Sequence, residues 1–436
     1  MTSETTEPAA RRFGTRQAAF IGVGSMVGAG IFSLLGTAGE IAGSAVWISF
    51  VLAGILAALQ GYSFAKLGAR FPSAGGLIEY INQAFGRGHL ATVMAWLGYF
   101  INVIVTAMVA VSFGSYASSA LTGGDPAWIK VFGVALVVAM TILNIAGSAF
   151  VARVQSAIVF VVIGILALFA VVTILNANFA LLAPSTYPSF RQIVSSVALT
   201  FFAFLGFGVV TFTARDLPDP TRQLPRAMAI AIGIATAIYV AVAIGVFGTL
   251  PVQEVIDSGA TAIAVAAQPV LGNAGFWLMS VTALFATTGA TNAGLYPAPG
   301  IGDHLSRTRQ FPPFMGRRIG GRTSVSLLIA SAGTIINLVL FDLSAIASIG
   351  SAVALVVFTM ITAGHLRIRE KTGANVWILL VAVATATVSL LTFVFTSLID
   401  EPASIVMLVV ILALSVGLDL LWGRGAQAGA AATEGA

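Results

Sequence analysis

The sequence predicts a polytopic all-α membrane protein with twelve transmembrane helices. Of its 436 residues, 58% are hydrophobic and only 8% are charged, whereas a soluble domain carries about 25% charged residues. A helix that crosses a bilayer needs about 20 predominantly apolar residues. Twelve such stretches are present, at approximately 17–41, 45–67, 89–120, 127–147, 152–176, 191–213, 226–249, 273–299, 323–341, 343–364, 374–397 and 402–422.

The basic residues predict the orientation of these spans. Nineteen of the 21 Lys and Arg residues fall in segments that the alternation places on one side, and only Lys130 and Arg191 fall on the other. Positive charges gather on the cytoplasmic side of a membrane, so we expect both termini in the cytoplasm and the chain in the cell membrane. The pI near 9.8 therefore indicates topology and contact with membrane lipid, not binding of nucleic acid.

Three connections between spans are longer than the rest. Residues 71–86 are expected to form a turn and an amphipathic helix, 251–272 a short helix pair over the outer face, and 303–322 a basic connection. The chain has no cysteine, which excludes disulfides, thiolate chemistry and cysteine-ligated metals. Its histidines, His89, His304 and His365, fall near predicted helix ends, so we expect no metal centre, and we expect no cofactor.

Glycines interrupt the first predicted span at the depth where a membrane helix should be most regular. Gly22, Gly24, Gly28 and Gly30 lie within nine residues, and each costs about 1 kcal/mol of helix propensity relative to alanine. Irregular backbone inside a bilayer is tolerated only where protein buries it or where it lines a cavity. The stretch therefore indicates either a helix broken within the membrane or close helix packing through small residues.

The sixth predicted span repeats this interruption, because Gly206 and Gly208 fall at mid-membrane among phenylalanines. Spans one and six begin on opposite sides of the membrane, as an inverted repeat of five plus five helices requires. Paired glycine interruptions at corresponding positions indicate the midplane binding site of a secondary transporter. The predicted organisation is a tail over 1–15, a first repeat over 16–176, a second repeat over 177–370, a further helix pair over 371–423 and a tail over 424–436.

Two broken helices suit a ligand that carries both charges. The first amides of a half-helix lack intrahelical partners, and together with the helix dipole they bind an anion without a charged side chain. Carbonyl oxygens at the opposing end of a broken helix can face a cation. An α-amino acid has a carboxylate and an ammonium group, so we expect a small molecule of this class as the substrate.

At these residues the chain resembles the amino acid–polyamine–organocation (APC) transporters, whose members have the LeuT-type fold. The resemblance rests on 27–32 in the first span, on 72–76, 79–80 and 85–86 in the first long connection, and on 201–207, 219–222 and 225–227 in and after the sixth span. It covers spans one to ten and is nearest to broad-specificity prokaryotic amino acid permeases. It implies a five-plus-five inverted repeat with helices one and six broken, and spans eleven and twelve as an accessory pair.

The resemblance also implies a substrate site, with no catalytic residues. Backbone amides of Gly28, Ala29 and Gly30 would bind the substrate carboxylate. Carbonyls from Phe202 to Leu205 would face the ammonium, and Phe202 would act as an aromatic gate. The expected substrate-binding residues are Val27, Gly28, Ala29, Gly30, Ile31, Asn102, Phe202, Ala203, Phe204, Leu205, Gly206 and Ser348. The expected cation site consists of Gly24, Val27, Thr287 and Thr288, although these threonine hydroxyls could equally bond carbonyls of their own helix.

Departures from the family pattern leave the coupling ion open. Many relatives place a lysine in the fifth helix, where its ammonium stands in for a sodium ion, and the aligned residue here is Val162. Some relatives carry a glutamate where Gly208 stands here, and Pro297 and Pro299 interrupt the end of the eighth span. A proton symporter is the family expectation, ahead of sodium coupling and of exchange without a coupling ion.

The acidic residues predict the kind of substrate. None of the 16 Asp and Glu residues lies near the centre of spans one to ten. A cationic substrate side chain would therefore lack a buried counter-ion, and its desolvation without a partner is costly. We expect neutral amino acids as substrates.

Proteins of other classes are alternatives to a symporter. An amino acid exchanger would need no coupling ion, and a sensor of the same fold would bind its ligand without flux. An enzyme would need a buried nucleophile–base pair or clustered metal ligands, which no predicted span holds, so we expect no enzymatic activity. A channel fits two interruptions at the midplane less well than a gated binding site does.

Overall fold

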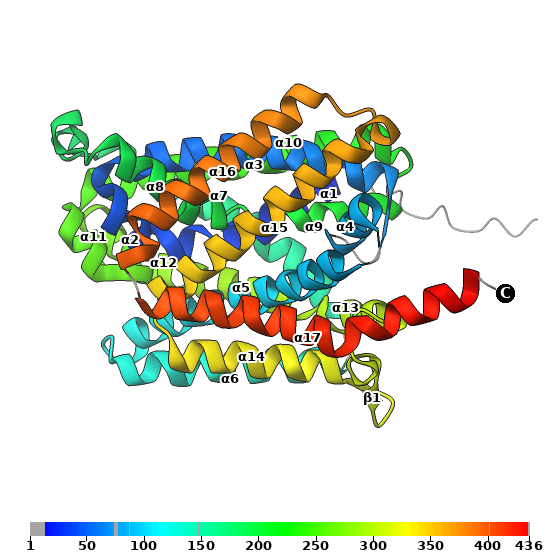
Figure 1. Cartoon of the computed structure of the whole chain (residues 1–436). Coiled ribbons are helices and arrows are strands. Elements are labelled where there is room, and N and C mark those ends of the chain that lie inside the picture. Colours follow the sequence, from blue (N-terminus) through cyan, green and yellow to red (C-terminus); the bar gives the residue numbers. More distant parts are fainter. Residues whose placement is uncertain (1–13, 74–76, 87, 147–148, 401, 435–436) are drawn as a thin grey trace, which may run out of the picture.

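The computed structural model describes residues 14–73, 77–86, 88–146, 149–400 and 402–434. Most of these residues are helical (Figure 1). The α-helices are α1 (Thr15–Ala29), α2 (Ile31–Ala42), α3 (Val46–Arg70), α4 (Leu77–Phe85), α5 (His89–Leu121), α6 (Pro126–Ala146), α7 (Ala149–Leu175), α8 (Phe190–Phe202), α9 (Phe207–Val210), α10 (Pro220–Thr249), α11 (Val252–Ser258), α12 (Ala262–Leu295), α13 (Ala298–Arg307), α14 (Val325–Leu340), α15 (Leu343–Thr372), α16 (Val376–Thr396) and α17 (Pro402–Glu434). Strands β1 (Arg318–Ile319) and β2 (Thr323–Ser324) pair in an antiparallel hairpin.

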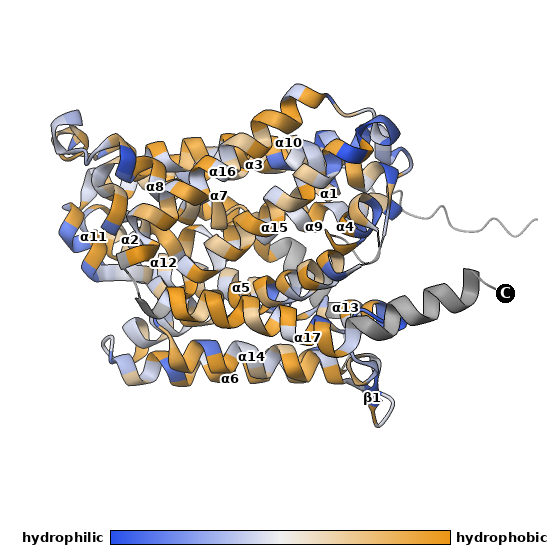
Figure 2. Cartoon of the chain, in the orientation of Figure 1, coloured by the Kyte–Doolittle hydropathy of each residue, from blue (hydrophilic) through white to orange (hydrophobic). Residues whose placement is uncertain are grey.

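Long apolar helices make this chain a multi-pass membrane protein. Within the described residues, nine helical stretches are long and apolar enough to cross a bilayer, and the bent pair α8–α9 provides a tenth. Figure 2 shows apolar residues along the lengths of the helices and hydrophilic residues mainly at two opposite ends of the bundle. This distribution is the one that a bilayer requires, because only the ends of the helices meet water.

The most deeply buried long helices are α5 and α15, and α6 and α17 are among the most exposed. Helix α5 contacts α6, α12 and α15, while α10 packs against α1, α3 and α7. Helix α14 lies beside α6 at the edge of the bundle (Figure 1). Helix α15 also contacts α8, and α1 contacts α9, the helix that follows α8.

The connections agree in part with the sequence predictions. The amphipathic helix expected in 71–86 is α4, although the Ala74–Gly75–Gly76 part of that motif lies outside the described residues. The outer helix pair consists of α11 and the first part of α12, which bends at Gly272 with a φ of 65°. The basic connection over 303–322 is more ordered than expected, because it contains the end of α13 and most of the β1–β2 hairpin.

Several helix ends differ from the predicted ones: α10 begins at Pro220 and not at 226, and α15 ends at Thr372 and not at 364. The eighth span was expected to reach residue 299, but α12 ends at Leu295 and α13 begins at Ala298. Pro297 and Pro299 explain this end, because proline has no N–H to donate to the helix. The apolar part of α17, Ser404–Trp422, agrees with the predicted twelfth span, and the helix itself continues to Glu434.

Candidate functional site

The first helix discontinuity is narrower than the glycine pattern predicts. Helix α1 continues through Ala29, and α2 begins at Ile31, so the break is confined to Gly30. The N–H of Gly30 donates to the Met26 carbonyl at 2.9 Å. Of the glycines in this stretch, only Gly30 separates the two helices, and Gly22, Gly24 and Gly28 lie within α1.

The other glycines of α1 serve close packing. A Cβ at Gly24 would lie 2.6 Å from a methyl carbon of Val159 in α7, and a Cβ at Gly28 would lie 2.8 Å from the Ala286 carbonyl oxygen in α12. At these distances no side chain fits, so both glycines let neighbouring helices approach the α1 backbone. The small-residue packing that the sequence left as an alternative describes this part of α1.

The second discontinuity is a full turn of altered backbone. Helix α8 ends at Phe202 and α9 begins at Phe207, and the two axes differ by 40°. Across the junction the hydrogen bonds run between residues three apart, as from Phe204 N to Phe201 O at 2.9 Å and from Phe207 N to Phe204 O at 2.9 Å. The interruption expected at Gly206 is confirmed, and Gly208 lies within α9.

The two discontinuities touch each other. A Cβ at Gly30 would lie 2.5 Å from the Ala203 Cβ and 2.8 Å from the Ala203 carbonyl oxygen. A Cβ at Gly206 would lie 2.5 Å from the Ser25 carbonyl carbon and 2.6 Å from the Met26 nitrogen. Each break therefore packs a glycine against the backbone of the other helix, and we call this contact the crossing.

Three other residues of the predicted substrate set lie on α8, α15 and α5. The Phe202 ring packs against α15, where a Cβ at Gly350 would lie 2.6 Å from its Cε2 atom. Ser348 is buried in α15, two residues before Gly350. The Asn102 amide in α5 donates from Nδ2 to the Gly294 carbonyl of α12 at 2.6 Å. The structure thus places Phe202 against α15 and ties Asn102 to α12.

The remaining residues of the predicted substrate set have different surroundings. Val27 and Ile31 are buried on either side of the discontinuity in the first helix. The Phe204 ring lies against Tyr239 of α10, with centroids 5.0 Å apart. Leu205 is half-buried in the turn of the second discontinuity.

A small cavity of about 10 Å³ lies between α1, α7 and α12. Such a volume holds about one water molecule. The lining residues are Gly24, Val27, Gly28, Ile158, Val159, Val162, Phe285, Ala286, Gly289 and Ala290. The cavity therefore includes Gly24 and Val27 of the predicted cation site, and Val162, which the resemblance placed at the position of a lysine in other family members.

The threonines of the predicted cation site bond their own helix. The hydroxyl of Thr287 donates to the Ala283 carbonyl at 2.6 Å, and that of Thr288 donates to the Leu284 carbonyl at 2.7 Å. Both residues use the helix-bonded arrangement that is common for threonine. Neither side chain lines the cavity beside Val162.

Comparison with known proteins decides the family. The chain matches the amino acid permease family over residues 13–418. The chain belongs to this family. It is 33% identical to an uncharacterised protein of Methanocaldococcus jannaschii over 364 residues, and this aligned region covers 82% of this chain and 83% of the relative.

Two further relatives have names that describe transport. The permease is 30% identical over 377 residues to the inner membrane transport protein YbaT of Escherichia coli, covering 86% of this chain and 88% of that protein. It is 27% identical over 363 residues to the Asc-type amino acid transporter 1 of Mus musculus, covering 76% and 67% of the two chains. Family and relatives place the permease among amino acid transporters of the APC superfamily.

The structure adds residues around the permease crossing that the sequence analysis missed. The Tyr239 hydroxyl of α10 donates to the Ala203 carbonyl at 3.1 Å, so it holds the turn that contacts Gly30. Ser33, three residues after Gly30, is fully buried, and its hydroxyl has no partner within the described chain. A lone tyrosine inside the apolar run 226–249 was the signal that could have identified Tyr239.

A buried amide pair also escaped prediction. The Asn144 Nδ2 atom of α6 donates to the Asn292 Oδ1 atom of α12 at 2.8 Å. Asn292 is buried, and Asn144 also donates to the Met140 carbonyl of its own helix. An asparagine in each of two predicted spans was the available signal, but nothing in the sequence showed that the two spans are neighbours.

His365 was wrongly placed near a helix end. Helix α15 continues to Thr372, and His365 is fully buried between α3 and the last turn of α15. Its Nδ1 atom lies 2.8 Å from Ser63 Oγ, and its Nε2 atom lies 2.7 Å from Thr372 Oγ1. Because Thr372 donates its own hydrogen to the Arg369 carbonyl, it accepts from Nε2–H, and Nδ1 then accepts from Ser63. A continuous hydrogen-bonded chain thus connects α3 to the end of α15.

Proposed function

We propose that this permease carries neutral amino acids across the cell membrane by alternating access. The observation that carries the proposal is the crossing, where Gly30 and Gly206 bring two interrupted helices into backbone contact inside the bundle. Discontinuous helices of this kind form the midplane sites of secondary transporters. The family membership supplies the substrate class, an amino acid.

In this proposal the substrate carboxylate lies at the start of α2 and the ammonium lies near the turn at residues 203–206. The positive end of the α2 dipole is at Ile31, which favours an anion. The buried hydroxyl of Ser33 offers a further donor. Because Gly30 N–H is bonded to Met26, we expect this bond to be exchanged for the carboxylate when substrate binds.

Scarcity of buried acidic groups supports a neutral substrate. Among the described residues, Asp419 is the buried acidic side chain. Its carboxylate lies 2.6 Å from His89 Nδ1 at the beginning of α5, where it already has a partner. A substrate with a cationic side chain would therefore be desolvated without a buried carboxylate to compensate it.

For coupling we propose proton symport, with exchange as the second candidate. The observation that favours exchange is the cavity beside Val162, whose ten lining residues include no ionisable side chain. Sodium coupling would depend on carbonyl oxygens such as that of Ala286, which faces Gly28. A sensor that binds amino acids without moving them is a further alternative, which the flux measurements below separate from a transporter.

We further propose twelve spans in a LeuT-type arrangement. The first repeat would contain α1–α2, α3, α5, α6 and α7, and the second would contain α8–α9, α10, α12, α14 and α15. Helices α16 and α17 would be the accessory pair. The excess of basic residues at one end of the bundle supports a cytoplasmic location for that end and for both termini. During transport, α1, α3, α8–α9 and α10 would rock against the remaining helices.

Uptake into proteoliposomes tests the proposal. Purified protein should accumulate labelled alanine or leucine, and unlabelled arginine should compete poorly. An inward proton gradient should accelerate net uptake, whereas a sodium gradient of equal size should not. Counterflow without net uptake would replace symport by exchange, and binding without any flux would leave the sensor. A strong preference for arginine would contradict the proposed neutral specificity.

A further inference from the structure

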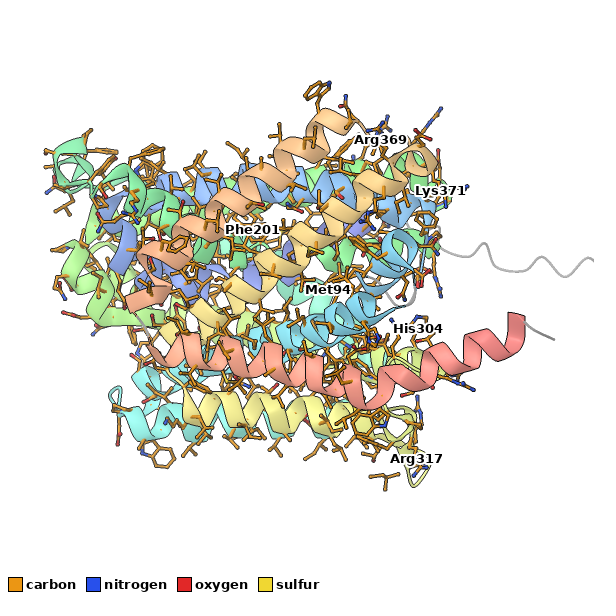
Figure 3. All side chains as sticks on the ribbon, viewed as in Figure 1. Met94, Phe201, His304, Arg317, Arg369 and Lys371 are labelled. Carbon is orange, nitrogen blue, oxygen red and sulfur yellow. The ribbon has the colours of Figure 1, made fainter. Side chains whose placement is uncertain are left out.

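A second cavity, of about 240 Å³, lies at the end of the bundle where α3 and α15 finish and α10 begins. It is lined by Lys66, Ala69, Arg70, Thr221, Lys371 and Thr372, and we call it the basic cavity. Figure 3 labels Lys371 and Arg369 at the same end of the molecule as Arg317. Since a water molecule occupies about 30 Å³ of liquid, the cavity has room for a hydrated ionic group.

Three of its six lining residues are cations, contributed by two helices. Lys66 and Arg70 lie one turn apart on α3, and Lys371 lies at the end of α15. Within the described chain, no ion pair joins any of the three to a carboxylate. Gathering like charges around one cavity without a counter-ion is unfavourable, so the arrangement favours a bound anion.

The acidic group beside the cavity already has partners. Asp219 accepts hydrogen bonds from the Thr221 hydroxyl and from the Arg222 N–H, and its other oxygen lies 3.8 Å from the Arg222 guanidinium. The hydrogen bond from Thr221 is the main cause that holds the pKa of Asp219 below its ordinary value. Glu370 precedes Lys371 and is exposed. The positive charge of the basic cavity therefore remains in excess.

The wall of the cavity on the α15 side is held in place. Thr372 accepts from His365 Nε2 and donates to the Arg369 carbonyl, and His365 is tied to Ser63 of α3. Lysine and arginine groups presented from fixed positions are the usual means of binding phosphate oxygens.

We propose that the basic cavity is a binding site for a phosphate group, either of an anionic lipid headgroup or of free phosphate. Lys66 and Arg70 would contact it from α3, and Lys371 would contact it from α15. Because the proposed transport motion separates α3 and α10 from α15, a bound phosphate would hold this end of the bundle closed. This last consequence rests on the proposed function, whereas the binding does not.

Thermal unfolding of the purified full-length protein tests the binding. In detergent, inorganic phosphate should raise the unfolding temperature above that in chloride of equal ionic strength. The variant K66Q/R70Q/K371Q should need at least about tenfold more phosphate for the same rise, because it loses three charge-assisted contacts. The matched variant R317Q/R318Q/R322Q removes three exposed charges from the same end and should respond like the unmodified protein. If the triple variant of the cavity does not fold, Lys371→Gln alone provides the comparison.

The source of the phosphate is decided in nanodiscs. If the unfolding temperature is higher in phosphatidylglycerol nanodiscs than in phosphatidylcholine nanodiscs, and the cavity variant does not show this difference, the ligand is a lipid headgroup. If only inorganic phosphate raises the unfolding temperature, the ligand is the free anion. Equal responses of the cavity variant and the unmodified protein in both media would overturn the site. If phosphate binds but leaves the uptake rate of an active protein unchanged, the closing role is wrong while transport itself stands.

Discussion

The two glycines at the crossing have no room for a side chain. Gly30 is the sharpest case, because an added Cβ would meet both the Cβ and the carbonyl oxygen of Ala203. We expect Gly30→Val to abolish uptake while the protein still inserts into the membrane, since the substitution separates two helices without adding charge. Gly164→Val is the control, because a Cβ added at Gly164 in α7 would have no neighbouring atom within 4 Å. Normal flux in Gly30→Val would show that the substrate site lies elsewhere.

The Tyr239 hydroxyl gives a second prediction for a single residue. Tyr239→Phe removes the hydrogen bond to the Ala203 carbonyl and leaves a buried acceptor, so the free energy of unfolding should fall by about 1–3 kcal/mol. Uptake should also fall, because the turn that contacts Gly30 loses its support. Tyr296→Phe is the matched control, since this residue is 74% exposed. Equal stability of the two variants would argue against a supporting role for Tyr239.

The sequence identified the glycines at the helix discontinuities, but it did not identify the residues that they contact. Gly30 and Gly206 stood out because glycine is costly inside a helix, and the structure places both at discontinuities. The partners, Ala203 and Ser25, carry no signal of their own, because contact with a glycine depends on how two helices cross. Thr287 and Thr288 were ambiguous for a related reason: a helical threonine can always bond its own turn.

Among the helices, the bend in α12 depends on one backbone conformation. Gly272 has a φ of 65°, which costs a residue with a Cβ about 1–2 kcal/mol. Gly272→Ala should therefore lower the free energy of unfolding by about that amount, measured by denaturation in detergent. Gly233→Ala in α10, where an added Cβ meets nothing within 4 Å, should instead be neutral or stabilising by up to about 1 kcal/mol. The opposite order would mean that the bend is not maintained in the membrane.

Most helices could be predicted because their apolar runs are long and are bounded by polar residues or proline. The bounds of α5, His89–Leu121, follow its hydrophobic run closely. The sequence left open whether Gly24 and Gly28 mark a break or close packing, because composition cannot show which helices approach them. Similarly, the last two turns of α15 are themselves a charged stretch, residues 367–371, and only the contact of His365 with Ser63 of α3 shows that His365 lies inside the bundle.

The whole molecule offers a direct test of its proposed orientation. Because the chain has no cysteine, single cysteines can be introduced without a background of native thiols. Ser185 and Arg317 are both exposed and lie in different connections. In intact cells, a membrane-impermeant maleimide should label Ser185→Cys and should label Arg317→Cys only after the cells are permeabilised. The reverse pattern would invert the orientation, and labelling of both would contradict the number of spans between them.

The crossing also has a consequence for how sequences of such permeases can diverge. A Cβ at Gly30 would meet the Cα atom and the carbonyl oxygen of Ala203, and a Cβ at Gly206 would meet backbone atoms of Ser25 and Met26. Every amino acid carries these backbone atoms, so no substitution at the partner position can make room for a side chain at either glycine. In an alignment of relatives that keep this contact, positions 30 and 206 should therefore remain glycine even where the residues opposite them vary.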